Sequence, residues 1–424
     1  MIGVIGLFLS LLLFIFMSFK GWNIAVSATL ASVLLVFTNH MNLADSLSVT
    51  FASGFGGFAS SWWLMFALGA LFGKAMQETG MSSALARLLS ERLHGNAMMM
   101  ILLISLIMSY GGIGTFVIAF TIYPIASELF QKEGISTVLL PAAMLFCPTT
   151  LSMTMLPGTP SVQNILPTKY LDTDIYAAPV LGVIASIITF LLGSAYLFHA
   201  AKKYTTESKE SSSDPLQKSD SKDWLSLLPC ICLWIMPFLL VRFGLDSQLS
   251  VEIAMIAGII ICLAAGRKKY NIRQVINQGF VNGLETLAMT SCIMGYGSLV
   301  KATPAFSMIT DHLFGASSNP LLSSILAVNL IAAITGSSTS GLQLFFDSFS
   351  EQLTAIPLSS AQFHRIIAIA SGGLDSMPYA TGVAVANDLS KTKLSKTYLH
   401  IFITCAVIPL IALAVVLLAM SFTE

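Results

Sequence analysis

The chain has 424 residues, of which 55% are hydrophobic and only 10% are charged. Soluble proteins carry about 25% charged residues, so this composition indicates an integral membrane protein and excludes a disordered or disulfide-stapled secreted chain. The 21 basic residues balance 21 acidic ones, which leaves no net positive field for nucleic acid.

A membrane-spanning helix needs about 20 mostly apolar residues. In chain order, the stretches that suit such a helix are 2–19, 22–38, 57–77, 176–199, 224–243, 248–266, 280–300 and 398–420. The stretches 136–168 and 362–390 are apolar but interrupted by proline, glycine and polar residues, so each is predicted to be a broken helix. The stretches 96–130 and 320–354 have Gly/Ser-rich centres and are predicted to be re-entrant hairpins, which enter and leave the membrane on one side.

The distribution of basic residues favours this arrangement, because cytoplasmic loops are enriched in Lys and Arg. The polar segment 200–223 is placed in the cytoplasm as a solvated linker. All basic residues except Lys169, Arg242, Lys301 and Arg365 then fall on the cytoplasmic side. The predicted all-α topology has about ten crossings, two re-entrant hairpins and both termini outside.

The linker divides the chain into two regions, 1–199 and 224–424, that have the same order of parts. Matching positions are Gly54-Phe55 with Gly279-Phe280, Gly111 with Gly336, and Pro157 with Pro378. Because each region has an odd number of crossings, the second is predicted to be inverted relative to the first. Inverted repeats with broken helices are typical of secondary transporters.

The hairpin turns and helix breaks are the predicted binding site. Non-helical backbone at membrane depth must line a cavity or be buried in protein, and each break exposes a helix N-terminus that attracts anions. The predicted substrate-binding residues are Gly111, Gly112, Gly114, Thr115, Thr154, Pro157, Gly158, Thr159, Gln163, Asn164, Thr335, Gly336, Ser337, Ser338, Gly372, Gly373, Ser376 and Tyr379. Since no Lys or Arg lies at the breaks, neutral donors are expected to hold a small mono-anion. The alternative is that these glycines and prolines only kink the helices.

Ionisable residues within membrane segments are candidates for function. Asp375 lies in the second break and is predicted to bind the coupling proton; alternatively, it caps the half-helix that follows. His364 and Arg365, earlier in the same segment, are expected to be interfacial anchors. Glu128 and Asp347 are expected to be solvated near the open ends of the hairpins.

Other chemistry is not expected. The chain has no ATP-binding motif, so uphill transport would need an ion gradient or a partner chain. The histidines lack metal-ligand spacing and the cysteines lie in apolar runs, so no metal or cofactor is predicted. The glycines of the Gly69–Lys74 segment suggest a close helix–helix contact rather than a phosphate loop. No nucleophile–base pair supports an enzyme.

Several motifs resemble those of the gluconate permease family. The most specific is Leu156-Pro157-Gly158-Thr159-Pro160, followed by Gln163-Asn164 and Pro167-Thr168. The family has similar motifs at further positions, which are the segment from His364-Arg365 to Pro378, the turn Ser109–Gly114, Gly54-Phe55, Gly69 and Lys74. Together these matches run along almost the whole chain.

The resemblance implies a proton symporter for gluconate or a related hydroxy acid such as hydroxybutyrate, glycerate or D-serine. It further implies membership of the ion transporter superfamily, an elevator mechanism, a homodimer and a bacterial inner membrane. Many relatives carry His-Asn where this chain has Tyr379-Ala380, which favours a less hydroxylated acid such as 3-hydroxybutyrate or lactate. The hydroxyl-rich Thr335–Ser340 turn leaves sodium coupling open, and a passive anion channel is a further alternative.

Overall fold

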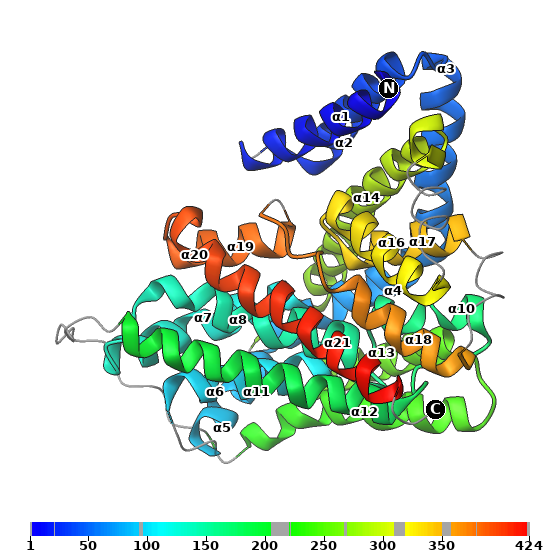
Figure 1. Ribbon diagram of the computed structural model, residues 1–424. Helices are drawn as coiled ribbons and strands as arrows, with labels where there is room; N and C mark the ends of the chain where they lie inside the picture. Colours follow the sequence, from blue (N-terminus) through cyan, green and yellow to red (C-terminus); the bar gives the residue numbers. More distant parts are fainter. Residues whose placement is uncertain are drawn as a thin grey trace.

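The computed structural model describes residues 2–20, 22–92, 96–204, 220, 222–266, 269–308, 319–349, 358–378 and 380–421. These residues form helices joined by turns and loops, with no β-strand among them. Figure 1 shows α1 (Ile2–Phe19) and α2 (Ile24–Thr38) as a pair that lies apart from most of the other helices. The long helices α4 (Ala52–Glu78) and α14 (Ile272–Lys301) connect this pair to the rest of the molecule.

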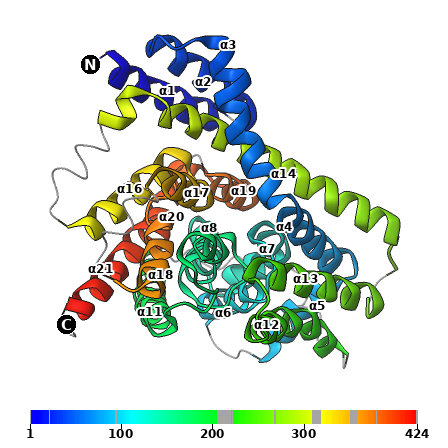
Figure 2. The same ribbon diagram turned by 90° about the vertical axis from the view of Figure 1, so that its right-hand side faces the viewer.

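The helices α4 and α14 form a central crossing. A Cβ added to Gly279 would lie 2.8 Å from Leu71 Cα, and one added to Gly283 would lie 2.7 Å from Ala67 Cα. The two helices therefore run antiparallel at a distance that only glycine permits. The α1–α2 pair packs on α14, and the pair formed by α12 (Leu227–Arg242) and α13 (Ser247–Ala264) packs on α4. Figure 2 shows these two pairs at opposite ends of the crossing.

Each segment predicted to be a hairpin folds into two helices and a short turn. The first consists of α6 (Ala97–Tyr110) and α7 (Thr115–Lys132), and the second of α16 (Pro320–Thr335) and α17 (Ser338–Phe349). The turns contain Gly112 at φ +80° and Gly336 at φ +59°, which is a left-handed conformation that glycine adopts without a steric penalty. Residues 350–354 of the second predicted hairpin lie outside the described residues.

The segments predicted to be broken helices are interrupted where proline and glycine occur. The first contains a 3₁₀ turn (Thr137–Leu139), α8 (Leu140–Phe146), a π-helix (Cys147–Met155), a break, α9 (Val162–Ile165) and α10 (Thr168–Leu171). The second contains α18 (Ser360–Ser371), a break, and α19 (Thr381–Ser390). The chain continues after them into α11 (Pro179–Lys203), and into α20 (Leu394–Phe402) and α21 (Ile408–Ser421), respectively. A further helix, α5 (Met81–Arg92), was not predicted.

Within the described residues, six helical stretches are long and apolar enough to cross a membrane. They are Leu43–Glu78, Thr137–Met155, Pro179–Lys203, Asp223–Arg242, Ser247–Ala264 and Leu394–Met420. The helices α1, α2, α6 and α16 contain shorter apolar stretches. The second broken segment is absent from both groups, because its break leaves helices of 12 and 10 residues that carry several polar and charged side chains. Helix length and composition therefore identify fewer than the expected ten crossings among the described residues.

Candidate functional site

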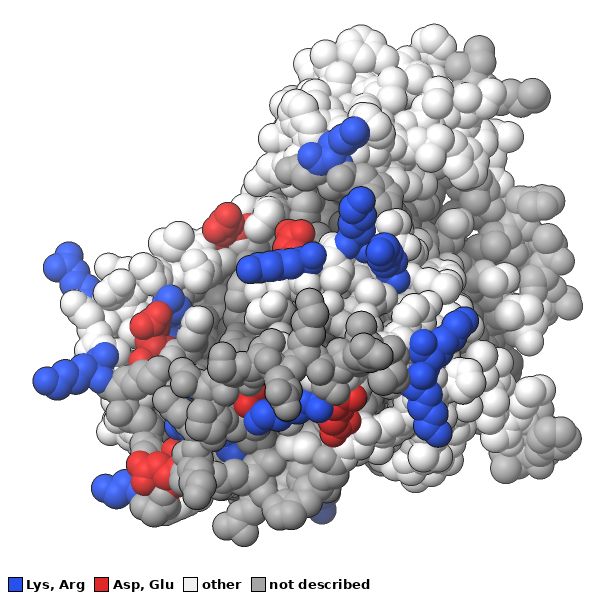
Figure 3. Space-filling view, turned by 90° about the vertical axis from the view of Figure 1, so that its left-hand side faces the viewer, with Lys and Arg blue, Asp and Glu red and all other residues white. Residues whose placement is uncertain are grey.

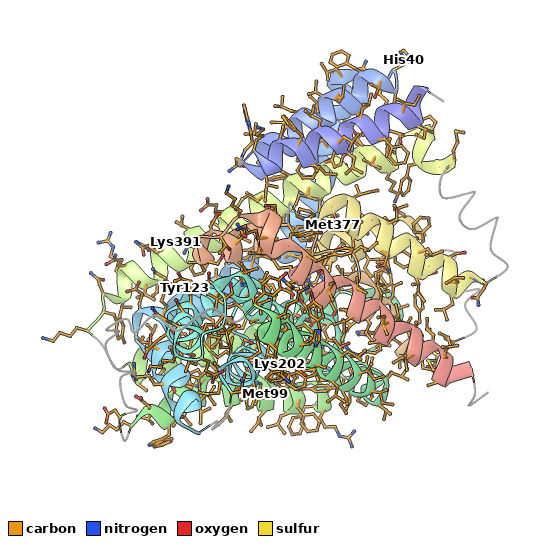
Figure 4. All side chains as sticks on the ribbon, turned by 60° about the vertical axis from the view of Figure 1, so that its left-hand side comes forward. His40, Met99, Tyr123, Lys202, Met377 and Lys391 are labelled. Atoms are coloured by element: carbon orange, nitrogen blue, oxygen red, sulfur yellow. The ribbon has the colours of Figure 1, made fainter. Side chains whose placement is uncertain are left out.

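The two hairpin turns and the two helix breaks meet around one cavity of about 580 Å³. It lies between this group and one wall formed by α4 and α14. Met377, in the second break, lies near the middle of the molecule (Figure 4). The cavity is thus lined by segments from both halves of the chain, which are distant in the sequence.

Many of the residues predicted to bind substrate line this cavity. They are Gly112, Gly114, Thr115, Thr159, Gln163, Thr335, Gly336, Ser337, Ser338 and Ser376, together with Asp375. The others, which are not among the lining residues, are Gly111, Thr154, Pro157, Gly158, Asn164, Gly372 and Gly373. Tyr379 lies outside the described residues.

Hydrogen bonds between side chains hold the turns against the first break. Ser109, at the first hairpin turn, and Ser152, in the π-helix, have their hydroxyl oxygens 2.6 Å apart. The amide Nε2 of Gln163 donates to Ser338 Oγ at 2.8 Å and to Thr339 Oγ1 at 2.9 Å. The first break is therefore bonded to the hairpin turns of both halves of the chain.

Two helices begin at the cavity without a side-chain cap. The N-cap of α7 is Gly114 and that of α19 is Ala380, and neither makes a side-chain cap hydrogen bond. Both N-cap residues line the cavity. The first N–H groups of a helix have no partner within the helix, and the dipole makes that end positive. These two ends can therefore donate hydrogen bonds to an anion in the cavity.

Asp375 is a buried carboxylate at the cavity, with 7% of its surface exposed. Ser376 Oγ donates to its Oδ1 at 2.9 Å, and Ser338 lies within hydrogen-bonding reach. The N-cap position of α19 belongs to Ala380, and the carboxylate of Asp375 instead bonds to Ser376 and Ser338, so Asp375 is not the N-cap residue of this helix.

His364 and Arg365 are not interfacial anchors, because both are fully buried. Arg365 donates to the carbonyl of Met155 at 3.3 Å, to that of Ile175 at 3.3 Å, and to that of Ala177 at 3.0 and 3.1 Å. The guanidinium thus bonds to carbonyls without helical partners at the end of the π-helix and in the loop between α10 and α11. The sequence could not show this, because a single arginine close to one end of an apolar segment gives the same pattern whether it lies at the membrane surface or in the protein interior.

Several predicted binding residues instead hold the breaks together. A Cβ added to Gly372 would lie 2.9 Å from Thr154 Cγ2, so the two breaks touch there. Gly158 has φ +76° and faces the ring of Tyr176, where a Cβ would come within 2.4 Å. Asn164 Nδ2 donates to the carbonyl of Thr159 at 3.1 Å. Gly158, Asn164, Gly372 and Thr154 are thus packed within the protein and are not among the residues that line the cavity.

The acidic residues of the hairpins differ from each other. Asp347 is exposed, as expected, and accepts a hydrogen bond from Tyr170 at 2.7 Å. Glu128 is partly buried, with 14% of its side chain exposed, and it pairs with Lys132 at 2.6 Å. Neither is among the residues that line the cavity.

Comparison with known proteins identifies the kind of protein that carries this cavity. Residues 1–253 match the model of the GntP family permeases. The chain belongs to the GntP permease family. It is therefore a transporter and a multi-pass membrane protein, and its resemblance to the gluconate permease family is confirmed.

A relative and a solved structure agree with this assignment. The protein described as uncharacterized transporter YxjC of Bacillus subtilis (strain 168) is 28% identical over 449 aligned positions, which cover 94% of this chain and 95% of the relative. The crystal structure of the Alcanivorax borkumensis YdaH transporter is similar with a TM-score of 0.51 and 16% identity, over 89% of this chain and 88% of that one. At this identity the likeness concerns the fold alone. A transporter rather than an enzyme agrees with the sequence analysis.

The cavity of this GntP permease also contains residues that the sequence analysis missed. On the α4 and α14 wall these are Lys74, Gln77, Asn282, Thr286 and Thr290. The four-residue spacing of the last three places them on one face of a helix, a signal that the sequence does contain. Among the described lining residues Lys74 is the only basic one and Asp375 the only acidic one. The four breaks do lack basic side chains of their own, but the expectation of a purely neutral site is wrong for the cavity as a whole.

Proposed function

We propose that this GntP permease is a secondary active transporter that imports a small hydroxy-monocarboxylate together with protons. The substrate would be gluconate, 3-hydroxybutyrate, glycerate or a similar acid. The observation that carries this proposal is that one cavity of about 580 Å³ contains two uncapped helix N-termini and a buried carboxylate, Asp375.

The two helix ends would hold the substrate carboxylate, since their free N–H groups and dipoles favour negative charge. Hydroxyl groups of Thr115, Thr159 and Ser338 lie at the same cavity and could bond the substrate hydroxyls. The cavity volume suits a small organic acid, because ligand pockets of about 300–1,000 Å³ hold small molecules.

Asp375 would carry the coupling proton. A carboxylate that is buried beside an anion is repelled by it, so a bound substrate favours the protonated form of Asp375. Proton and substrate would then bind together and leave together, which is the condition for symport. Ser376, which donates to Asp375 at 2.9 Å, would stabilise the charged form after the proton has left.

We further propose two inverted repeats and an elevator mechanism, in which the hairpins and broken helices move against a scaffold. The matched packing of α1–α2 on α14 and of α12–α13 on α4 supports the repeat. Gly54 and Gly279, at matching repeat positions, both lie at the α4–α14 crossing, where a Cβ on Gly54 would come within 2.9 Å of the Met294 carbonyl. The first two helices of each half would serve as scaffold and as the contact of a homodimer.

The orientation in a bacterial inner membrane is also a proposal. Figure 3 shows one face of the molecule over much of which Lys and Arg side chains are spread, whereas the upper part of that view is largely uncharged. Cytoplasmic surfaces of membrane proteins are enriched in these residues. This face would be cytoplasmic, with both termini on the opposite side.

Uptake by purified protein in lipid vesicles tests the proposal. With a proton gradient, radiolabelled D-gluconate or 3-hydroxybutyrate should accumulate above its external concentration, and collapse of the gradient should abolish the accumulation. Equilibration without accumulation would indicate a passive channel instead. Accumulation that follows a sodium gradient alone would support the alternative of a sodium-coupled carboxylate symporter, for which the hydroxyls of Thr335 and Ser337 at the cavity are suitable ligands.

A further inference from the structure

One end of the cavity wall carries a charged pair. The helices α4 and α14 run antiparallel, with Gly279 level with Leu71 and Gly283 level with Ala67. The cavity-lining residues of α4 are Met65, Phe66, Gly69, Ala70, Lys74 and Gln77, whereas those of α14 are Asn282, Thr286, Met289, Thr290 and Ile293. In this register Lys74 and Gln77 extend beyond the last lining residue of α14. They therefore lie at an end of the cavity wall.

Lys74 faces the cavity while its partner faces solvent. Its Nζ lies 2.8 Å from Oε1 of Glu78, and the exposed fractions of the two side chains are 17% and 43%. Glu78 is not among the residues that line the cavity. An ion pair one helical turn apart with one exposed partner contributes little to stability. A carboxylate that arrives from solvent can therefore replace Glu78 at Lys74.

The pair of Lys132 and Glu128 has the same spacing but the opposite arrangement. There the lysine side chain is 51% exposed and the glutamate 14%, and neither residue lines the cavity. This second pair provides a matched control, since it has the same chemistry on another helix without access to the cavity.

We propose that Lys74 and Glu78 form an anion subsite at the mouth of the cavity, which recruits the carboxylate of the substrate. Lys74 attracts the anion into the cavity, and Glu78 competes with it for the ammonium group. The polar side chains of Asn282, Thr286 and Thr290 line the wall further inward. This inference rests on the proposed transport of a small carboxylate. It adds an earlier step, in which Lys74 captures the substrate before the substrate binds at the helix N-termini.

The local charge can be measured without knowledge of the substrate. Ala70 lines the cavity one turn from Lys74, so Ala70→Cys places a thiol beside the subsite. The partly buried Cys232 and Cys292 are first replaced by Ser to lower the background. The thiolate attacks the sulfenyl sulfur of a methanethiosulfonate reagent, which forms a mixed disulfide and releases methanesulfinate. Rates with the anionic sulfonatoethyl reagent and the cationic trimethylammonioethyl reagent are compared for the full chain in detergent.

Opposite effects of the two partners are expected. Lys74→Gln should lower the ratio of anionic to cationic rate by about fivefold, because one nearby positive charge is lost. Glu78→Gln should raise the same ratio, whereas Lys132→Gln and Glu128→Gln should leave it unchanged. If the charges of the pair do not act at the cavity, the ratio stays unchanged in Lys74→Gln and Glu78→Gln, and that outcome would overturn the proposal. A shift in the same direction in both variants, which indicates a change of structure rather than of local charge, would also overturn it. Gly69→Cys, also at the cavity, replaces Ala70→Cys if that variant does not fold.

Transport by the same charge variants separates this inference from the proposed function. In vesicles that take up D-gluconate or 3-hydroxybutyrate, Lys74→Gln should raise KM and Glu78→Gln should lower it, with kcat nearly unchanged. Opposite shifts in the reaction rates without uptake of either acid would support the subsite and contradict the proposed function. Normal uptake without any shift in the rates would overturn the subsite and leave the proposed function intact.

Discussion

Gln163 and Ser338 are joined by a hydrogen bond of 2.8 Å between the amide Nε2 and the hydroxyl oxygen. Gln163 belongs to the first broken helix and Ser338 to the start of α17, so the bond links the two halves of the chain at the cavity. Both side chains are buried. Binding of a ligand at this point would therefore be sensed by both halves at once.

Loss of this link should impair transport. Gln163→Ala removes the bonds to Ser338 and Thr339, each worth about 1 kcal/mol. We expect the uptake rate in vesicles to fall by about tenfold, with a smaller loss of thermal stability. The control is Gln131→Ala, because Gln131 is exposed near the end of α7. Wild-type uptake by Gln163→Ala would show that the link has no role in transport.

Asp375→Asn should uncouple transport from the proton gradient. The amide keeps the shape of the buried side chain, but it cannot bind and release a proton at physiological pH. Gradient-driven accumulation should be lost, while exchange of labelled for unlabelled substrate across the vesicle membrane continues. Ser376→Ala, which removes only the bond of 2.9 Å to the carboxylate, should retain accumulation at a reduced rate. Undiminished accumulation by Asp375→Asn at mildly acidic pH contradicts the role of Asp375 in coupling.

Two glycine substitutions should separate substrate binding from folding. Gly114 lines the cavity and a Cβ there would meet no atom within 4 Å, so Gly114→Ala should fold normally. Its methyl group would lie at the start of α7 and weaken substrate binding, which we expect to see as a higher KM. Gly158→Ala should lower the melting temperature instead, because φ is +76° and the ring of Tyr176 occupies the space. Thermal unfolding and uptake kinetics of both variants check this, and equal losses of stability would contradict it.

Arg365 should be essential for the integrity of the first break. Arg365→Gln removes the donors of the Met155 and Ala177 carbonyls and one of the three donors of the Ile175 carbonyl. Because the site is fully buried, we expect a loss of about 3 kcal/mol in stability and a strongly reduced melting temperature. Arg242→Gln, on an exposed residue at the end of α12, should be close to neutral. Comparable stability of the two variants would show that Arg365 does not hold the break.

The segments of the fold could be predicted because their causes are local. Apolar runs determine where helices form, and the glycines and prolines near Gly112, Pro157, Gly336 and Pro378 determine where they stop. The π-helix Cys147–Met155 and helix α5 were not predicted. A change of helical pitch depends on packing, and α5 is too short and too polar for a search based on apolar spans.

The binding site could be predicted only in part. Residue type and order are enough to predict that the hairpin turns and the breaks lack regular backbone hydrogen bonds. The packing of the folded chain, however, determined that Gly114 faces the cavity and Gly158 faces Tyr176, although both are glycines at a break. It also decided that Arg365 is buried and that Lys74 lines the cavity. These placements could not be predicted because the surroundings of a side chain come from segments distant in the chain, and no local pattern shows which of them will be its neighbours.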